Sequence, residues 1–442
     1  MKSVMICSPS YALHGGVESI VNDLCRYLPS RGWNPVLALA KGARFNDVER
    51  YRQTHPGLPI IELDGTRGTR QARIESLIRQ IRRVRPDVVM NARIYDSYAA
   101  MAQFKQKAGS PRFITTIRAY EADYFHDAWV YRNIVDLCLV SGNMVAAAAP
   151  RFTGIAPERI ISIPGGVHKP LLPALPRTLR SPIRLGYVAR INQEQKRSLD
   201  LLPTLERLER LGISFTLAIA GSGPQEEELK SSLHRFIRSG QVTWYGWVSR
   251  ERLYEELYPE MDCLLHFAQV EGVTISPREA MAHGVVPVIS RFAGLKCEGQ
   301  FLHEKNSLTF PVGDTEGAAE HLRRLVQEPG LLTRLSAEAI RSQSGVYGFE
   351  GNLDAWAAAF DRSLELPPLT GPVPGGDCAD KGRLARLGLS PWLAQRLRDL
   401  TGRRPLYDDP GSEWPTSTRQ IPRETAQALM DFAREYEAAL DH

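Results

Sequence analysis

The feature that most constrains the fold of this chain is an alternation of short apolar runs with segments of helical periodicity. The first run, at residues 4–7, is followed by a loop of small residues and by apolar residues at helical spacing over 17–28. Further apolar runs follow at residues 35–40, 87–90, 112–117 and 137–140. Strands that alternate with helices in this way predict a parallel, doubly wound sheet.

The same alternation begins again after a proline-rich stretch at residues 169–182. Its apolar runs are residues 183–188, 215–220, 242–245, 263–267 and 285–290. Because 442 residues exceed what one hydrophobic core usually supports, we expect an α/β protein of two Rossmann-like domains that share a cleft, over residues 1–170 and 171–365. A stretch rich in proline and glycine and two further helical patterns, near 391–400 and 423–439, predict a helical C-terminal extension over 366–442.

Composition excludes several classes of protein. No run of about 18 apolar residues occurs, and the N-terminal apolar run is too short for a signal peptide, so we expect a soluble, cytoplasmic protein. The six cysteines lie far apart, without the close Cys/His pairs of a zinc site or the density of a disulfide scaffold. We therefore expect reduced, mostly buried thiols.

Basic residues are concentrated in the first half of the chain. Residues 1–169 carry 23 Lys and Arg against 14 Asp and Glu. Many of these cations lie in residues 67–85, where apolar side chains recur at helical spacing and arginines fall mainly on the other faces. Two interpretations remain open: a solvated outer face of a helix, or a surface for anionic lipid or a phosphate-bearing acceptor. No recognition motif accompanies the charge, so we expect no nucleic-acid partner.

Two glycines, Gly15 and Gly16, lie where the first strand turns into the first helix. Glycine lets backbone N–H groups approach an anion at the start of a helix, although a glycine pair of purely geometric purpose explains the pattern as well. The loop departs from the GxGxxG fingerprint, and the next strand ends without an acidic residue. A nicotinamide or flavin enzyme is therefore disfavoured.

The second half holds cations and small residues at the ends of its first strands. Arg190 and Lys196 flank one strand-to-helix loop, and a guanidinium and an ammonium there can clamp a diphosphate and neutralise the charge that grows on it as a leaving group. Gly221 and Gly223 follow the next strand.

Two glutamates, Glu271 and Glu279, lie eight residues apart. We expect Glu271 to precede a helix that contains Glu279, so that the two carboxylates hold opposite ends of one extended ligand. The backbone amides between them would point at an anion or at sugar oxygens from the helix start. These amides belong to Gly272, Val273, Thr274 and Ile275. Two ordinary surface glutamates are the alternative.

In this order and at this spacing, these motifs resemble the retaining glycosyltransferases of the GT-B fold, specifically glycosyltransferase family four. The resemblance covers roughly residues 3–365 and is strongest over 183–320, where residues 280–284 (AMAHG) and 287–290 (PVIS) contribute to it. It is weaker in the first glycine loop and in residues 163–167 (IPGGV), and it is absent from the C-terminal extension.

The resemblance implies a role for each matched residue. Arg190 and Lys196 match the pair that binds the donor diphosphate, Glu279 the glutamate that holds the ribose hydroxyls, and Glu271 the one that holds the transferred sugar. Gly16 matches the glycine loop that closes over the donor phosphates. Val248 ends a stretch that by resemblance lies near the base. Family members retain the anomeric configuration and need no metal, and a phosphate oxygen is described as their base, so neither a protein nucleophile nor a cofactor is expected.

One position departs from the family pattern. Where the family often carries a histidine near the sugar, this chain has Arg118. Either Arg118 binds an anionic acceptor, or His126 takes the role of that histidine. For His126, a partly buried ring beside its aromatic neighbours is the alternative.

The favoured function is therefore transfer of a sugar from a UDP- or GDP-sugar to a glycan or lipid-linked acceptor during synthesis of a cell-surface polysaccharide or glycoconjugate, with peripheral contact with an anionic membrane left open. A nucleotide-sugar epimerase of the same fold and a catalytically silent sugar or nucleotide binder remain as alternatives.

Overall fold

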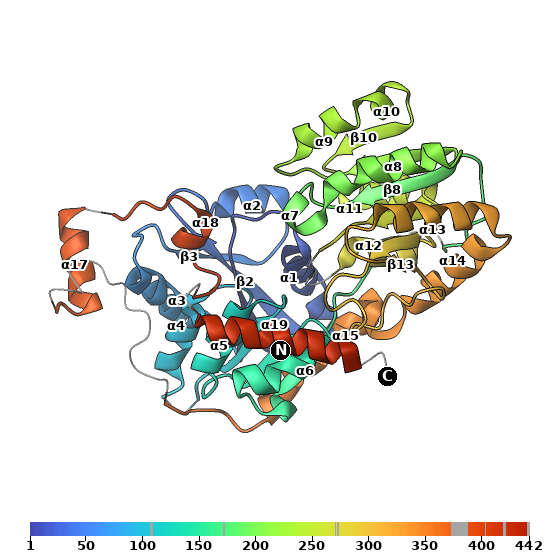
Figure 1. The fold of residues 1–442 in the computed structure, drawn as a ribbon. Helices are drawn as coiled ribbons and strands as arrows, with labels where there is room; N and C mark the ends of the chain where they lie inside the picture. The colour runs from blue at the N-terminus through green and yellow to red at the C-terminus, as the bar shows by residue number, and fades with distance from the viewer. Residues whose placement is uncertain are drawn as a thin grey trace. The chain divides into compact units, whose positions relative to one another are not determined.

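The structure is a computed structural model that describes residues 1–106, 109–170, 173–269, 271, 274–372, 388–402, 404–418 and 421–439. The chain forms two compact units, each with its own sheet (Figure 1). Unit 1 consists of Met1–Pro164 and Leu353–Asp431, and unit 2 of Gly165–Asn352 and Phe432–His442. The domain ranges expected from the sequence are continuous stretches of the chain, whereas each of these units combines two stretches that pack together. Most of the described C-terminal extension belongs to unit 1.

Unit 1 contains a seven-stranded sheet in which every strand pair is parallel, in the order β3-β2-β1-β4-β5-β6-β7. The strands are β1 (Lys2–Ser8), β2 (Trp33–Lys41), β3 (Ile60–Asp64), β4 (Val88–Asn91), β5 (Arg112–Ile117), β6 (Leu137–Val140) and β7 (Ile160–Ser162). The helices of its N-terminal part are α1 (Gly16–Tyr27), η1 (Leu28–Arg31), α2 (Val48–Thr54), α3 (Arg70–Val84), α4 (Asp96–Phe104), α5 (Ala122–Val130), α6 (Asn143–Thr153) and η2 (Pro157–Arg159).

Both faces of this sheet are covered. On β1, Val4 and Ile6 pack into a core with side chains of α1 and α15 (Phe349–Glu365). The alternate residues Met5 and Cys7 are fully buried on the opposite face. Side chains of a strand alternate between faces, so a run that is apolar throughout requires cover on both sides. The continuous runs in the sequence therefore correctly predicted a doubly wound sheet.

Unit 2 contains a six-stranded parallel sheet in the order β10-β9-β8-β11-β12-β13. The strands are β8 (Ile183–Val188), β9 (Phe215–Ala220), β10 (Val242–Gly246), β11 (Cys263–His266), β12 (Val286–Ser290) and β13 (Leu308–Phe310). The helices are α7 (Gln193–Lys196), η3 (Ser198–Asp200), α8 (Leu201–Arg210), α9 (Glu226–Ser232), α10 (His234–Arg238), α11 (Arg250–Arg252), η4 (Leu253–Leu257), η5 (Tyr258–Glu260), α12 (Ile275–Ala282), α13 (Thr315–Gln327), α14 (Leu331–Ser342) and η6 (Gly345–Tyr347).

The two cores of unit 2 identify its two covered faces. Leu185 and Leu217 share one core with α8, α9 and α13, whereas Leu264 shares the other with η4 and α12. In a parallel sheet the carboxyl ends of all strands lie along one edge, which is where such folds bind ligands. The loops after β8, β9 and β11 therefore meet at that edge, and these loops hold the residues that the sequence indicated.

The C-terminal part of the chain adds α15 and three described helices, α17 (Pro391–Thr401), α18 (Pro410–Glu413) and α19 (Arg423–Ala439). Within unit 1, Trp356 and Phe360 of α15 lie in the same core as Trp33 of β2, with ring centroids of Trp33 and Phe360 5.3 Å apart. The helical patterns near 391–400 and 423–439 are confirmed. The one cysteine without a structural description, Cys378, lies outside the described residues.

The basic segment of the first half forms α3, which begins after the side-chain cap Thr69. The expectation that its arginines lie mainly on outer faces is wrong for Arg73, which is buried and donates to Asp96 at 2.6 Å. Asp96 needs a partner because it is itself fully buried. Arg79, Arg82 and Arg83 are exposed. Among the described residues, no helix combines the length and apolar character that crossing a bilayer requires.

Candidate active site

The loops at the carboxyl edge of the unit 2 sheet are held against one another by backbone contacts. Gly221 follows β9 with a φ of 145°, and a Cβ there would lie 1.9 Å from the carbonyl oxygen of Ala189. A Cβ on Gly223 would lie 2.1 Å from the carbonyl oxygen of Ile191. Only glycine fits either position, so the predicted small-residue loop lets the loop after β9 pack directly on the loop after β8.

Lys196 and Glu271 meet at this edge. Lys196 is the last residue of α7, whose cap Asn192 accepts from the backbone N–H of Gln195 at 2.8 Å. The ammonium of Lys196 forms an ion pair with Oε1 of Glu271, whose side chain is only 4% exposed. The backbone of Gln269 also donates to the carbonyl of Gln195 at 2.9 Å. Two loops 75 residues apart in sequence therefore present one partly buried cation–carboxylate pair.

His266, the last residue of β11, holds the same carboxylate. Its Nε2 lies 2.9 Å from Oε1 of Glu271, and its ring is buried. Burial lowers the pKa of His266, against the opposing effect of Glu271. For Glu271, burial raises the pKa, but Lys196 and His266 outweigh it, and the net pKa is lowered. At neutral pH the carboxylate is therefore ionised and His266 is neutral with its proton on Nε2, since an ionised carboxylate can only accept.

Glu279 lies on α12 and has a different environment. Its carboxylate accepts from the hydroxyls of Tyr254 at 3.2 Å and Tyr258 at 3.0 Å, on η4 and η5. Burial raises its pKa, and the hydrogen bond from Tyr258 opposes the shift. The sequence correctly predicted that Glu271 precedes this helix and Glu279 lies within it. One site thus holds an ion-paired carboxylate with a lowered pKa and a hydroxyl-bound carboxylate with a raised pKa.

Arg278, the neighbour of Glu279, ties the segment around Gly165 to α12. Its guanidinium donates to the carbonyl oxygens of Gly165 and Tyr347, the second at 3.0 Å. Burial lowers the pKa of Arg278 to about 10. A Cβ on Gly166 would lie 2.6 Å from Cβ of Asn352, so this glycine permits the close approach. Gly165 of the IPGGV segment therefore lies against the helix that carries Glu279.

The other predicted donor residues of unit 2 that the structure describes lie at or near the same edge. Arg190 follows β8, is exposed, and forms no ion pair within the described part of the chain. Val248 follows β10 and packs on the core that η4 and α12 share. Thr274 and Ile275 begin α12, where no side chain caps the helix and Ser276 Oγ donates to the carbonyl of Val188 at 2.7 Å. Gly272 and Val273 lie outside the described residues.

The predicted residues of unit 1 lie at three separate places. Gly15 is the cap of α1 and Gly16 its first residue, both exposed, and no side chain caps this helix. Arg118 is buried: its Nη1 donates to the carbonyl of Ile163 at 2.7 Å, and its guanidinium lies 5.5 Å from the ring of Trp356. The ring of His126, on α5, stacks on Trp129 with centroids 5.6 Å apart.

Sequence reasoning did not identify His266, Tyr254 and Tyr258. Two signals were available: a histidine at the end of an apolar strand, and two tyrosines four residues apart, which share a helix face. The partners of these side chains are fixed only when β11, η4 and α12 pack together. Among the described residues, no group of three or more His, Cys, Asp or Glu side chains is arranged to hold a metal ion.

Comparison with known families gives two matches that together span both units. Residues 14–169 match the model of "Glycosyltransferase Family 4", and residues 179–342 match that of "Glycosyl transferases group 1". The chain belongs to glycosyltransferase family four. The protein is thus a glycosyltransferase, as the resemblance of its motifs implied. No curated protein matches the sequence.

Solved structures share the fold of this glycosyltransferase. The galactosyltransferase WaaB of the lipopolysaccharide outer core, in its apo form, is 17% identical, with a TM-score of 0.64 over 82% of this chain and 99% of WaaB. A glycosyltransferase from Rickettsia africae is 14% identical, with a TM-score of 0.65 over 82% and 99%. Anabaena Alr3699/HepE in complex with UDP is 13% identical, with a TM-score of 0.63 over 82% and 100%. The GT-B architecture of two Rossmann-like domains is confirmed.

Proposed function

We propose that the glycosyltransferase takes a sugar from a UDP- or GDP-sugar and transfers it, with retention of anomeric configuration, to a glycan or lipid-linked acceptor in cell-surface polysaccharide or glycoconjugate synthesis. The observation that carries the proposal is the pairing of Lys196 with Glu271 at the edge of the sheet that also holds Glu279. UDP in the HepE structure and UDP-glucose in another structure of the same protein support a nucleotide-sugar donor.

In this proposal the bound donor replaces the contact between Lys196 and Glu271 with a separate contact to each of them. The diphosphate of the donor takes the ammonium of Lys196 and the guanidinium of Arg190, which is exposed. Glu271 then accepts hydrogen bonds from hydroxyls of the transferred sugar while His266 keeps its carboxylate oriented. An ionised carboxylate is a stronger acceptor than a neutral one, and the lowered pKa of Glu271 keeps it ionised.

Glu279 takes the ribose hydroxyls at the other end of the donor. Tyr254 and Tyr258 hold its carboxylate in place, so the oxygens need little reorganisation when the nucleotide binds. The side chain of Thr274, the N-cap residue, does not hydrogen-bond to the start of α12. The first backbone N–H groups of this helix can therefore donate to phosphate or sugar oxygens.

The chemical step needs no protein nucleophile. The bond between the anomeric carbon and the diphosphate oxygen breaks, and the acceptor hydroxyl oxygen bonds to that carbon on the same face. The hydroxyl proton passes to an oxygen of the departing diphosphate. Lys196 and Arg190 stabilise the negative charge that grows on this leaving group.

Incubation with radiolabelled UDP- and GDP-sugars tests the proposal against its two alternatives. The expected result is label in a glycan or lipid-linked product, with the anomeric configuration of the donor. Conversion of the free donor to another nucleotide sugar would instead identify an epimerase. Nucleotide binding without either product would identify a silent binder.

A further inference from the structure

The C-terminal segment of residues 404–418 covers part of the carboxyl edge of the unit 1 sheet. Both family models end before it, and the similar structures match only 82% of this chain. The ribbon shows α18 of this segment beside the ends of β2 and β3 (Figure 1). The segment therefore lies outside both family models, at the edge where a parallel sheet binds ligands.

Glu413 and Trp414 fix the segment to this edge. The Glu413 carboxylate accepts from the backbone N–H groups of Arg44 at 2.8 Å and of Phe45 and Asn46 at 2.9 Å, in the loop after β2. The fully buried Trp414 donates from Nε1 to the carbonyl of Lys41 at 3.0 Å. Both side chains fill space that glycines leave open: a Cβ would lie 2.1 Å from Glu413 at Gly42 and 2.5 Å from Trp414 at Gly65.

The segment then continues across the ends of β4 and β5. The carbonyl of Pro415 accepts from the backbone N–H of Tyr95 at 2.9 Å, and Ser417 Oγ donates to Asp123 at 2.9 Å. Between them, Thr416 hydrogen-bonds to the hydroxyl of Tyr124, which also bonds to Arg93. The segment thus covers the ends of β2 and β3 and borders the part of the edge near β4 and β5.

Arg93 follows β4 and organises that bordering part. Its guanidinium donates to Glu18 at 3.1 Å and to the Tyr11 hydroxyl at 2.8 Å. Its backbone has a φ of 72°, in the left-handed region that non-glycine residues seldom adopt. Tyr11, Arg93, Tyr124 and Thr416 are partly exposed. Thr416 and the two tyrosines offer hydroxyl groups, and the tyrosines also offer aromatic rings. These groups commonly bind carbohydrate.

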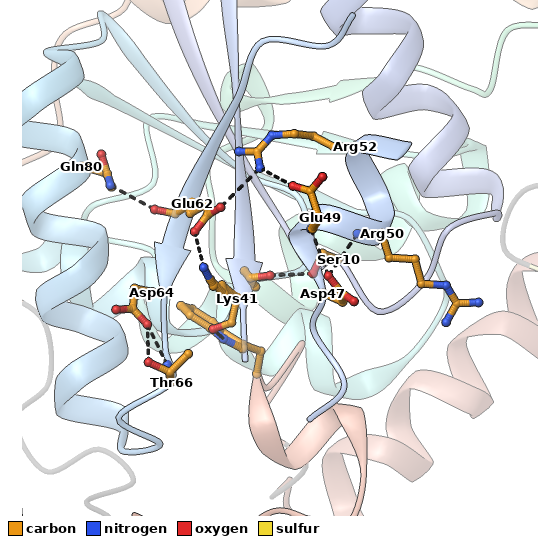
Figure 2. Close-up of polar contacts among 12 residues, drawn as sticks. Ser10, Lys41, Asp47, Glu49, Arg50, Arg52, Glu62, Asp64, Thr66 and Gln80 are labelled. Carbon is orange, nitrogen blue, oxygen red and sulfur yellow. Dashed lines mark hydrogen bonds and ion pairs between the residues drawn. The ribbon is translucent and has the colours of Figure 1, made fainter. Parts of the chain in front are cut away.

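Three cations that end or follow the strands of unit 1 are already paired with carboxylates. Lys41 at the end of β2 pairs with Glu62 at 2.7 Å, as Figure 2 shows. Arg67 after β3 pairs with Glu75 and Asp399, and Arg93 pairs with Glu18. Arg118 after β5 is buried and donates to a backbone carbonyl. An acceptor phosphate that binds Lys41, Arg67 or Arg93 would have to displace a carboxylate, whereas an uncharged hydroxyl would not.

We propose that residues 404–418 form one wall of the acceptor site, and that this site takes an uncharged, hydroxyl-rich carbohydrate rather than a phosphorylated one. The inference rests on the proposed function, since it assigns the acceptor of the same reaction. Thr416 and Tyr124 contact the acceptor from opposite sides of the border between the segment and α5.

The first test compares acceptors. Wild-type enzyme is given its UDP- or GDP-sugar with a panel of methyl glycosides of common hexoses and with the corresponding hexose 6-phosphates. Transfer to at least one methyl glycoside is expected, at a higher kcat/KM than to its phosphate ester. Transfer confined to phosphate esters, or to no member of the panel, would overturn the inference.

The second test compares matched variants. Thr416→Val and Tyr124→Phe remove hydroxyls at the proposed wall, and Thr401→Val makes the same change as the first at an exposed position of α17. The first two variants should raise the acceptor KM roughly 3- to 30-fold, because each loses one or two hydrogen bonds to the acceptor. Their kcat and nucleotide Kd should stay within about twofold of the wild-type values. Thr401→Val should change none of these.

The outcomes separate the two proposals. Wild-type protein that binds neither UDP nor GDP by calorimetry would overturn the proposed function itself. If the wild type transfers sugar but Thr416→Val and Thr401→Val have the same acceptor KM, only the proposal that residues 404–418 form a wall of the acceptor site would be overturned. A purely structural role would lower kcat and thermal stability together and leave the acceptor KM unchanged.

Discussion

Lys196 of α7 and Glu271 after β11 form an ion pair that connects two loops at the carboxyl edge of the unit 2 sheet. The pair satisfies both charges before any donor arrives. Binding of a diphosphate must therefore compete with Glu271 for the ammonium, whereas Glu279, held by two tyrosine hydroxyls, is outside that competition. Substitution of the two glutamates should therefore affect different properties, nucleotide binding for Glu279 and turnover for Glu271.

The first prediction is that Glu279→Gln chiefly weakens nucleotide binding. Loss of a charged acceptor for the ribose hydroxyls should cost about 1–3 kcal/mol in the binding free energy of the nucleoside diphosphate and of the donor. Calorimetric titration of UDP or GDP measures this loss. Glu338→Gln on α14, which removes a partly exposed carboxylate of the same unit, is the control and should leave the affinity unchanged.

The second prediction concerns Glu271 and Lys196. Glu271→Gln should lower kcat roughly 10- to 100-fold, because its hydrogen bonds strengthen as the sugar approaches the oxocarbenium-like state. The affinity for bare nucleoside diphosphate should not fall, because the change removes the carboxylate that competes for the ammonium of Lys196. Lys196→Ala should damage both, since the diphosphate is present in the ground state and gains charge in the transition state. Steady-state kinetics beside calorimetry separate these effects. Equal loss of nucleotide affinity in the Glu271 and Glu279 variants would refute the assignment.

The third prediction is that activity survives chelation. In the proposed mechanism Lys196, Arg190 and the amides at the start of α12 carry the diphosphate charge that a Mg²⁺ ion between carboxylates would otherwise carry. Initial rates with and without EDTA should agree within about twofold. Complete loss of activity that added Mg²⁺ or Mn²⁺ restores would contradict the mechanism.

The fourth prediction concerns the exposed arginines of α3. Replacing Arg79, Arg82 and Arg83 with Gln should weaken partition onto vesicles that contain anionic lipid, by about 1 kcal/mol per cation at low salt. Added salt should weaken wild-type partition in the same way. Sedimentation with such vesicles measures both effects, and the same change at Arg207, Arg210 and Arg235 of unit 2 is the control. Unchanged partition would assign α3 to an ordinary solvated surface.

The fifth prediction concerns the pH dependence of the contact that Glu413 makes. Burial raises its pKa, but the hydrogen bonds from Asn46, Phe45 and Arg44 outweigh it, and the pKa falls below its ordinary value of 4.5. The stabilisation is therefore complete above about pH 4.5 and is lost as the pH falls through the lowered pKa. Glu413→Gln should destabilise unit 1 by about 1–3 kcal/mol at pH 7.

Thermal unfolding of wild type and Glu413→Gln at pH 7 and at pH values below 4.5 measures this contribution. The difference between the two proteins should shrink toward the acid end of the series. Glu424→Gln, an exposed change in α19, should show no difference at any pH. A difference for Glu413→Gln that persists unchanged in acid would show that the carboxylate charge has no part in the contact.

The sequence alone predicted the central strands of both sheets and the sheet edge that carries the candidate site. Its ten apolar runs predicted ten of the thirteen described strands, each within two residues of its bounds. The strands β3, β7 and β13 were missed because they are short and lie toward the sheet edges, where fewer apolar residues are needed. Parallel pairing then brings Lys196, Glu271 and the glycine loops to one edge.

Only the tertiary structure decided which partner each charged group has. His266 meets Glu271, and two tyrosines meet Glu279, because separate elements pack together, and a local pattern carries no information about such pairs. Arg73 resembled a surface residue until α3 and α4 brought it to the buried Asp96. The C-terminal extension resembled an appendage, yet Trp414 is fully buried against β2. Periodicity reports which face of an element is apolar, whereas the partner of a polar side chain depends on contacts between residues far apart in the chain.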